Sequence, residues 1–258
     1  MKLQSEDNKI HSLSQYVEYV ENLSKEYSVS RGHSKKSYVL LPGALRYDKE
    51  GKRKYSKRNI SYFMQTFKVN SHNYLSNPLD IRNDIEWMAM AQHYGLPTRL
   101  LDFTDSHIIS LLFAVENAFD EDDSEKEDAV VWFLNPIQLN YINTRNANYI
   151  NVEENTGCSN LDDFDGPVAI KCRKLNKRIN AQSGLFVYFA DADKKLEEYD
   201  INENVLKRVV IDKDDKRSIL ASLYAMGMNQ TKLYPELSSI AKDILITDNI
   251  REYIEGVE

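Results

Sequence analysis

The residues best suited to chemistry are concentrated in one run, Gln92–Ser106. Its sequence, QHYGLPTRLLDFTDS, places ten polar or special-backbone residues between two segments rich in apolar residues. Arg99 and Asp102 flank a Leu-Leu pair, so we expect part of each side chain to be buried, where a charge needs a partner. Arg99 and Asp102 could pair with each other. The other candidate partners are Arg31 and Glu86.

Several of these residues also have a structural explanation. Gln92 and His93 are predicted at a helix C-terminus, where the helix dipole favours an imidazolium and the pair could face an anion. They could equally cap the helix over Gly95. Thr104 and Ser106 precede an apolar segment and are typical helix-capping types. These observations leave binding and structural roles open.

The chain contains no GxGxxG, GxxxxGK[ST], GxSxG or HExxH motif. Its five histidines are scattered, and Cys158 and Cys172 are not paired with them at metal-ligand spacing. The acidic run 120–128 lacks the glycine and the ligand spacing of a calcium loop. We therefore expect no metal cofactor and, with only two cysteines, free thiols in a reducing compartment.

Net charge and hydropathy restrict the partners. A formal charge of −7 is expected to repel nucleic acid and anionic membranes over much of the surface. Basic clusters at 49–58 and 171–178 keep a local basic groove possible, although solvated loops or strand edges are the simpler interpretation. The first residues are polar, and no apolar run reaches the roughly 20 residues that cross a bilayer. We expect a cytoplasmic protein without a membrane partner.

Hydrophobic periodicity predicts helices in the first half and at both ends, with most strands in the second half. The predicted helices are 12–27 with a cap at Ser14, a helix around 60–67, 81–92, 108–119 capped by Asp105 or Ser106, one after Asp214, and 237–253. The predicted strands are 27–31, 99–103, 129–134, 168–171, 185–189 and 206–211. Segment 141–165, rich in Asn, Asp and Tyr, is predicted to form long loops. This pattern is typical of an α+β fold with a mixed, mostly antiparallel sheet and flanking N- and C-terminal helices.

The chain resembles the FRG-domain family. The matching pieces are Arg31-Gly32, YVLLP with Arg46, QHYGLPTRLLDFT, LLFAVENA, RINAQSGLF, and MGM followed by LYPEL. They follow the family's order over about residues 10–245, which implies a single FRG-type domain over 1–258. Ser30 stands where the family has an aromatic residue, so other groups must fill the space that this ring would occupy.

The order of the motifs is also similar to that of ADP-ribosyltransferases, and this similarity implies an NAD-binding cleft in a sheet that is split at the site. It assigns Arg31 to the early strand that holds NAD, residues 104–106 to the Ser/Thr-x-Ser strand end, and Gln182 to the segment near the catalytic centre. The residues expected to line the cofactor site are Arg31, Gly32, Gln92, His93, Arg99, Thr104 and Ser106.

The implied activity is transfer of ADP-ribose from NAD to a protein or nucleic-acid acceptor, or NAD hydrolysis, by a toxin or defence effector. Gln182 could hydrogen-bond a ribose hydroxyl but cannot offset the positive charge that develops on the ribose. Asp102 or Glu86 could supply a carboxylate instead. The alternatives are a non-catalytic module that binds a nucleotide or a partner protein in the same cleft, and a nucleic-acid-modifying protein that uses the basic loop 49–58.

Overall fold

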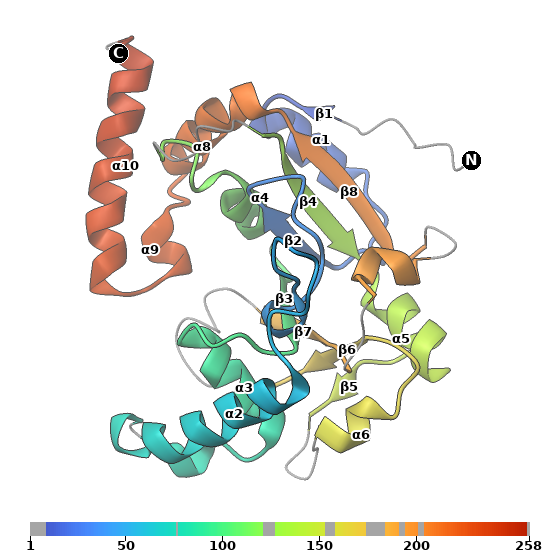
Figure 1. The fold of residues 1–258 in the computed structure, drawn as a ribbon. Coiled ribbons are helices and arrows are strands. Elements are labelled where there is room, and N and C mark those ends of the chain that lie inside the picture. The colour runs from blue at the N-terminus through green and yellow to red at the C-terminus, as the bar shows by residue number, and fades with distance from the viewer. Residues whose placement is uncertain are drawn as a thin grey trace.

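A computed structural model describes residues 9–75, 77–120, 127–152, 158–173, 184–190, 194–200 and 204–256. Within these residues one eight-stranded sheet runs in the order β1-β8-β4-β2-β3-β7-β6-β5 (Figure 1). Its strands are β1 Lys9–Ile10, β2 Val29–His33, β3 Leu100–Thr104, β4 Ala129–Leu134, β5 Ile150–Asn151, β6 Val168–Lys171, β7 Gly184–Tyr188 and β8 Leu206–Ile211. Only β1–β8 and β5–β6 pair in parallel among these strands. The predicted α+β fold with a mixed, mostly antiparallel sheet is confirmed.

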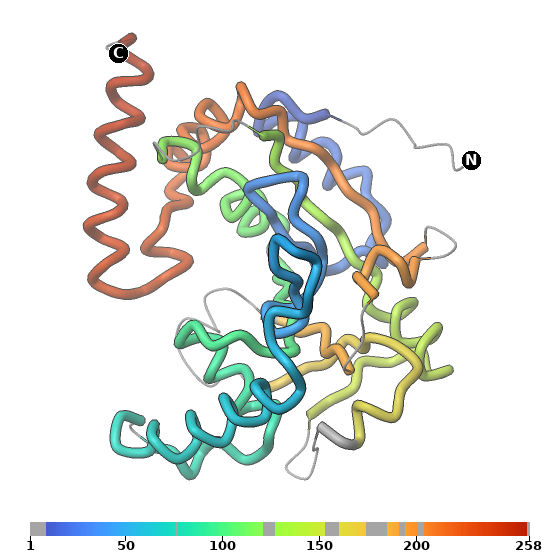
Figure 2. The backbone as a smooth tube through the Cα atoms, viewed as in Figure 1, coloured from blue at the N-terminus to red at the C-terminus, as the bar shows by residue number. Residues whose placement is uncertain are grey.

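The sheet is weakest between β2 and β3. Among the described residues these two strands pair at a single position, Ser30 opposite Thr104. By contrast, β2 pairs with β4 along its whole length, and β3 does so with β7. We call the junction at Ser30 and Thr104 the seam; it joins an upper half (β1, β8, β4, β2) to a lower half (β3, β7, β6, β5), as Figures 1 and 2 show.

The helices cover the two halves separately. They are α1 Leu13–Glu21, α2 Lys57–Ser71, α3 Asp84–His93, α4 His107–Val115, α5 Pro136–Thr144, α6 Cys158–Asp162, α8 Lys216–Ala225, α9 Gln230–Leu233 and α10 Leu237–Glu255. Helices α1, α4 and α8 pack on one face of the upper half, against apolar side chains of β4 and β8. Helix α3 packs on β6 and β7 in the lower half. Short 3₁₀ turns complete the described part: η1 Gly43–Leu45, η2 His72–Tyr74, η3 Pro78–Asp80, η4 Leu196–Tyr199 and η5 Lys213–Asp215.

Strong local signals placed several elements correctly. All six residues of β4 are buried, as their continuous apolar run predicts for a strand covered on both faces. Helix α1 is shorter than predicted and ends at Glu21. Its cap is Ser12 and not Ser14, because the Ser12 hydroxyl accepts a hydrogen bond from the Gln15 amide at 3.3 Å.

The prediction of long loops over 141–165 was wrong. The end of α5, strand β5 and helix α6 lie in this segment. Inside the segment Asn143 is buried and donates to the Pro167 oxygen at 2.7 Å. Asparagine side chains also organise the helix that leads into it: Asn135 caps α5, with Pro136 in the first turn. Asn140 is fully buried and bridges the backbone of Ala169 in β6, accepting from its nitrogen at 2.7 Å and donating to its oxygen at 2.9 Å. Asparagine-rich composition therefore reflects caps and buried bridges here.

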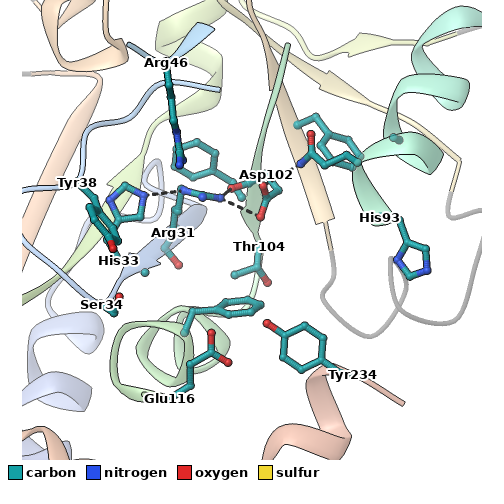
Figure 3. A pocket seen from close by; sticks show the side chains of 17 residues that line it. Arg31, His33, Ser34, Tyr38, Arg46, His93, Asp102, Thr104, Glu116 and Tyr234 are labelled. Carbon is teal, nitrogen blue, oxygen red and sulfur yellow. Dashed lines mark hydrogen bonds and ion pairs between the residues drawn. The ribbon is translucent and has the colours of Figure 1, made fainter. Parts of the chain in front are cut away.

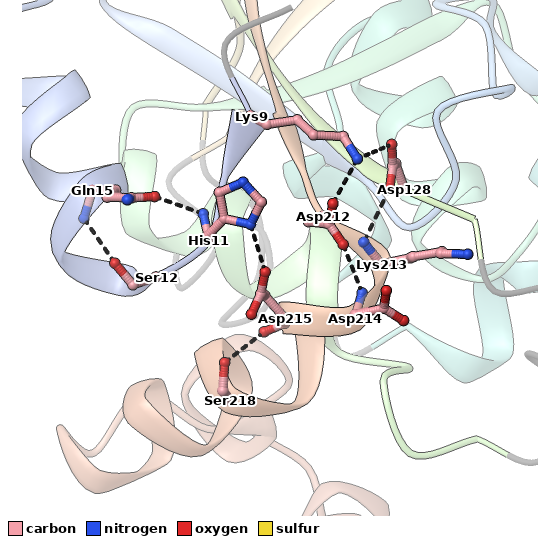
Figure 4. A network of polar contacts seen from close by, with 10 residues as sticks. All are labelled: Lys9, His11, Ser12, Gln15, Asp128, Asp212, Lys213, Asp214, Asp215 and Ser218. Carbon is pink, nitrogen blue, oxygen red and sulfur yellow. Dashed lines mark hydrogen bonds and ion pairs between the residues drawn. The ribbon is translucent and has the colours of Figure 1, made fainter.

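The edge strand β1 is fastened to β8 by ionic contacts (Figure 4). Lys9 Nζ lies 2.5 Å from Asp212 and 3.3 Å from Asp128, and His11 Nδ1 lies 2.7 Å from Asp215. The hydrogen bond to Asp212 is the main cause that raises the pKa of Lys9. Since these side chains are largely exposed, each pair adds little to stability.

The described residues contain neither a candidate membrane-spanning helix nor a candidate metal site. No helix there combines the length and the apolar character needed to cross a membrane. No group of three or more His, Cys, Asp or Glu side chains in the same residues could hold a metal ion.

Candidate functional site

A cleft of about 400 Å³ opens at the seam, where β2 and β3 diverge (Figure 3). Residues of β2, β3, β7, α3 and α4 line it, together with Tyr38, Arg46 and Tyr234. Its volume lies in the usual range for small-molecule sites. The weakness of the sheet at this point is what leaves room for the cleft.

A polar network crosses the seam. Arg31 of β2 donates from Nη1 to the carboxylate of Asp102 in β3 at 2.9 Å and to the Asp102 backbone oxygen at 2.8 Å. Its Nε donates to His33 Nε2 at 2.9 Å. The other carboxylate oxygen of Asp102 accepts from Gln92 Nε2 at 3.0 Å, and Gln92 in turn accepts from the Thr98 hydroxyl. The sequence-predicted residues Arg31, Asp102 and Gln92 therefore meet at one wall of the cleft.

The protonation states in this network suit the pairing. Burial raises the pKa of the Asp102 carboxyl, but the Arg31 guanidinium and backbone hydrogen bonding lower it more, so the net pKa lies below the usual range. Burial, followed by the positive charge of Arg31, lowers the pKa of His33 to about 3. His33 is thus neutral at neutral pH, and its Nε2 is free of a proton and able to accept from Arg31.

A second guanidinium lies beside the first. Arg46 donates from Nε to the Leu41 oxygen at 3.2 Å. Burial and the nearby Arg31 lower the pKa of Arg46. Within the part of the chain that the structure describes, neither Nη of Arg46 nor Nη2 of Arg31 has a hydrogen-bond partner. This wall therefore presents unused guanidinium donors and two positive charges beside the single carboxylate of Asp102.

The opposite wall carries a carboxylate and aromatic rings. Glu116, just after α4, accepts from Gln230 Nε2 at 3.0 Å. Burial raises the pKa of Glu116, although the Gln230 hydrogen bond lowers it in part. The rings of Phe113 and Tyr234 meet edge to face at 6.1 Å between centroids. Figure 3 shows Glu116 and Tyr234 across the cleft from Arg31.

Gly32 has a packing role at the cleft. A Cβ atom there would lie 1.9 Å from the Ser110 backbone oxygen and 2.8 Å from the Ala114 nitrogen. The missing side chain therefore allows the backbone of α4 to cross directly over β2. Gly32 lines the cleft, as predicted, but its first requirement is this close approach.

Polar groups fill the space beside Ser30. This side chain is fully buried, and its hydroxyl lies 2.7 Å from His107 Nδ1 and 2.7 Å from the Ser110 hydroxyl. The His107 ring packs edge to face on Phe133 at 5.2 Å. A hydrogen-bonded imidazole thus lies next to the residue that stands in place of the expected aromatic ring.

Two predicted site residues lie elsewhere. Glu86 is 1% exposed and receives hydrogen bonds from Arg173 Nε at 2.7 Å and Nη2 at 2.8 Å, and it does not line the cleft. Arg99 pairs with Asp162 at 2.7 Å and lines a different hollow, between α2 and α3. The structure therefore does not bring Glu86 or Arg99 to the Arg31 network.

The remaining predicted residues divide between the cleft and its edge. Thr104 and His93 line the cleft, although Figure 3 shows the His93 ring set apart from the Arg31 pair. The Thr104 hydroxyl accepts from the Ser106 amide at 3.1 Å. Ser106 occupies the N-cap position of α4 without a capping side-chain bond and does not line the cleft.

Gln182 lies outside the described residues, so its predicted role stays a prediction. The next described residue after it, Gly184, begins β7 and pairs with Thr104. Because Thr104 also pairs with Ser30, three strands meet at the seam.

The cleft is also lined by residues that were not among the predicted site residues, including His33, Arg46, Glu116 and Tyr234. Strand alternation could have indicated His33, which shares a face of β2 with Arg31. Glu116 is the single acidic residue in LLFAVENA, and a lone carboxylate beside an apolar helix is also a usable signal. No local pattern indicates Tyr234, which tertiary packing brings to the cleft.

Comparison with known proteins gives one match. The sequence model of the FRG domain matches residues 26–123, which include β2, β3, α3 and α4. The matched segment contains Arg31, Arg46, the Gln92–Ser106 run and Glu116, but ends before β7 and Tyr234. No curated protein and no solved structure matches the chain. Residues 26–123 of the chain therefore match the FRG domain.

Proposed function

We propose that the cleft binds NAD and that the chain is an ADP-ribosyltransferase-type enzyme, acting as a toxin or defence effector. The observation that carries this proposal is the pair Arg31 and Arg46, two guanidinium groups beside one carboxylate at the wall of a cleft. Guanidinium donors match phosphate oxygens in geometry and charge. A pyrophosphate would relieve the repulsion between the two cations and use their remaining donors.

The opposite wall suits a ligand that carries, besides its pyrophosphate, groups of a different chemistry. Phe113 and Tyr234 offer ring faces and edges for a heteroaromatic base. Glu116 offers a carboxylate suited to ribose hydroxyls and to a cationic centre. A dinucleotide with a pyrophosphate and a cationic nicotinamide riboside combines these features.

The proposed reaction breaks the bond between ribose C1′ and the nicotinamide nitrogen. Nicotinamide leaves with the bonding electron pair, and the positive charge on the ribose is stabilised by the Glu116 carboxylate. A hydroxyl or water oxygen, or an amine nitrogen, of the acceptor then bonds to C1′ and loses its proton to that carboxylate. Asp102, already paired with Arg31, would hold the arginine in place, and Gln182 would hydrogen-bond a ribose hydroxyl.

A non-catalytic nucleotide-binding module is the second candidate. One observation favours it: the Arg31 guanidinium is already held at Nε and Nη1 by His33 and Asp102, which is also the geometry of a fixed binding element. Such a module would be stabilised by a nucleotide but would release no nicotinamide.

The test combines NAD binding and turnover in one sample, with melting temperature and free nicotinamide followed together. At about 100 times the Kd, NAD should stabilise the fold by about 2.7 kcal/mol. Arg31→Lys, which keeps the charge but loses the donor fork, should weaken binding about tenfold or more. Glu116→Gln should keep the NAD-induced shift and lower nicotinamide release by about 100-fold or more.

Matched controls lie on the exposed face of α10. Arg251→Lys and Glu252→Gln should change neither measurement. Stabilisation by NAD and ADP-ribose without nicotinamide release would favour the binding module. No shift with millimolar NAD, ADP-ribose or ADP, and no nicotinamide, would refute the assignment of the cleft to nucleotides.

A further inference from the structure

The positive charge of the chain is distributed unevenly. Residues 51–79 contain six Lys and Arg residues and no Asp or Glu. The rest of the chain holds the other 27 of the 33 Lys and Arg residues against all 40 Asp and Glu residues. This cationic segment runs from the loop before α2, along α2, to the turns that follow it. In a protein with a net charge of −7, so marked a separation points to an anionic partner at this segment.

The same segment forms a groove rich in exposed aromatic rings. The groove, of about 550 Å³, lies along α2 and η2 and reaches the end of α3 at Tyr94. We call it the aromatic groove. Its rings are Tyr62, Phe63, Phe67, Tyr74 and Tyr94. Tyr62 is 61% exposed, Tyr74 89% and Tyr94 63%, so three large rings are open to a ligand.

Cations are interleaved with these rings. Arg58 is exposed and lies one helical turn before Tyr62 on the same side of α2. Lys54 lies 5.6 Å from the centre of the Tyr55 ring, which packs edge to face on Phe63. Of the residues that the structure describes, no charged side chain lines the aromatic groove itself. The arrangement is thus an uncharged floor of rings with positive charge at its border.

We propose that the aromatic groove binds single-stranded nucleic acid, a partner that goes beyond the proposed NAD chemistry. Unpaired bases would stack on Tyr62, Tyr74 and Tyr94, since every base offers a π-face. The phosphates between them would face Arg58 and Lys54 at the border. A duplex would keep its bases paired and away from the rings, and an apolar peptide would not use the cationic border.

The aromatic groove and the cleft lie next to each other at the end of α3. Tyr94 belongs to the groove and His93 lines the cleft, and their rings meet edge to face at 4.7 Å. A strand lying on the rings therefore has a path toward the cleft opening. This places the bound strand where an acceptor for the proposed reaction would be presented, although binding itself does not depend on that reaction.

The experiment measures fluorescence anisotropy of labelled 12-nucleotide single strands, both DNA and RNA of mixed sequence, with the full chain at low salt and without NAD. Single strands should bind more tightly than the corresponding duplex. The double variant Tyr62→Ala/Tyr74→Ala should weaken binding about tenfold or more, because stacking on each ring is lost. Arg58→Glu should weaken binding and reduce the dependence of log K on log salt by about 0.7 for the lost phosphate contact.

Two controls match these variants in chemistry and exposure. Tyr141→Ala removes a tyrosine that is 49% exposed on α5, and Arg251→Glu reverses a charge on α10. Both should bind single strands as the parent chain does. The proposal is overturned if no oligonucleotide binds at low salt, if the double tyrosine variant binds normally, or if a polyglutamate of equal charge, which has no bases, binds as tightly. The last two results would assign the segment to acidic protein partners or to non-specific attraction.

Discussion

Two arginine–aspartate pairs, each with one member in the Gln92–Ser106 run, have similar local geometry and different surroundings. Arg31 and Asp102 are 2.9 Å apart, with side chains 17% and 48% exposed. Arg99 and Asp162 are 2.7 Å apart, with side chains 14% and 40% exposed. In each pair a largely buried guanidinium meets a half-exposed carboxylate. Distance and burial alone would not indicate which pair belongs to a binding site.

The residues around each pair distinguish the Arg31 pair from the Arg99 pair. The Arg99 pair lies within the lower half of the sheet, where the guanidinium is 4.9 Å from the centre of the Tyr188 ring and the Tyr188 hydroxyl donates to the same Asp162 oxygen at 2.7 Å. The Arg31 pair crosses the seam and has Arg46 beside it. The Arg99 pair borders a hollow but is stabilised by the ring and the hydroxyl of Tyr188, whereas the Arg31 pair has a second guanidinium beside it at the wall of the cleft. The lesson is that an excess of like charge around a pair, and not the pair itself, indicates a ligand.

The largest loss of stability is expected from Gly32→Ala. This substitution tests the comparison because it disturbs only the upper half of the sheet. The new Cβ would overlap the Ser110 oxygen, and backbone on both sides must move. Overpacking of this kind typically costs 1–3 kcal/mol, and we expect about 3 kcal/mol or more because the obstacle is backbone. For a chain of this size that is a fall in melting temperature of about 6–12 °C.

Gly43→Ala is the matched control for this substitution. A Cβ there would lie 3.5 Å from its nearest neighbour, which is ordinary contact. Its melting temperature should stay within a few degrees of the parent. Equal stability of Gly32→Ala and Gly43→Ala would mean that the close approach of α4 to β2 is not required.

The next largest effect is the pH dependence of the free energy of unfolding. It arises from His33, which contacts Arg31, and does not involve the Arg99 pair. The pKa of His33 is about 3 in the folded state and about 6.5 in an unfolded chain, so the unfolded state binds the extra proton first. Stability should therefore be constant above about pH 6.5 and fall below it, by at most about 1.4 kcal/mol per pH unit. We expect a loss of about 3 kcal/mol at pH 4 from this group.

His33→Gln removes the titrating group and keeps an oxygen that can accept from Arg31 Nε. Urea unfolding from pH 4 to 7 should show a flatter dependence for this variant than for the parent chain. His11→Gln, which alters a contact of β1 outside the cleft, should leave the parent slope between these pH values in place. An unchanged slope in His33→Gln would show that His33 is not held neutral by its surroundings.

The sequence indicated the Arg31 wall better than the opposite wall. Arg31 was one of the expected partners of Asp102, because Asp102 follows a Leu-Leu pair and a buried charge needs a counter-charge. Strand β4 has the predicted bounds because a long apolar run specifies a buried strand with little ambiguity. Strand β8 also has the predicted bounds, although only its second half is a continuous apolar run. These features depend on residues close in sequence or on a short list of possible ion pairs.

The opposite wall depends on tertiary packing between distant segments. Glu116 and Gln230 are more than a hundred residues apart, and neither predicts the other. Glu86 was a candidate carboxylate for the cleft, but it lies on α3 facing Arg173, a direction that helix periodicity alone did not give. The asparagine-rich segment after β4 was predicted as loops because composition does not distinguish a solvated asparagine from a buried bridge such as Asn140.

Arg99→Ala is expected to give the smallest loss of stability, and it tests which of the two pairs responds to NAD. It removes the contact with the Tyr188 ring, worth about 0.5–2 kcal/mol, while the half-exposed Asp162 can be hydrated after its partner is lost. We expect urea unfolding to show a loss of about 1–2 kcal/mol, with the NAD-induced rise in melting temperature retained. Arg31→Ala should give the opposite result, losing the NAD effect with a similar or smaller cost in stability. If Arg99→Ala removed the NAD effect and Arg31→Ala kept it, the ligand would have to lie in the hollow between α2 and α3, and the excess of positive charge at the seam would need another explanation.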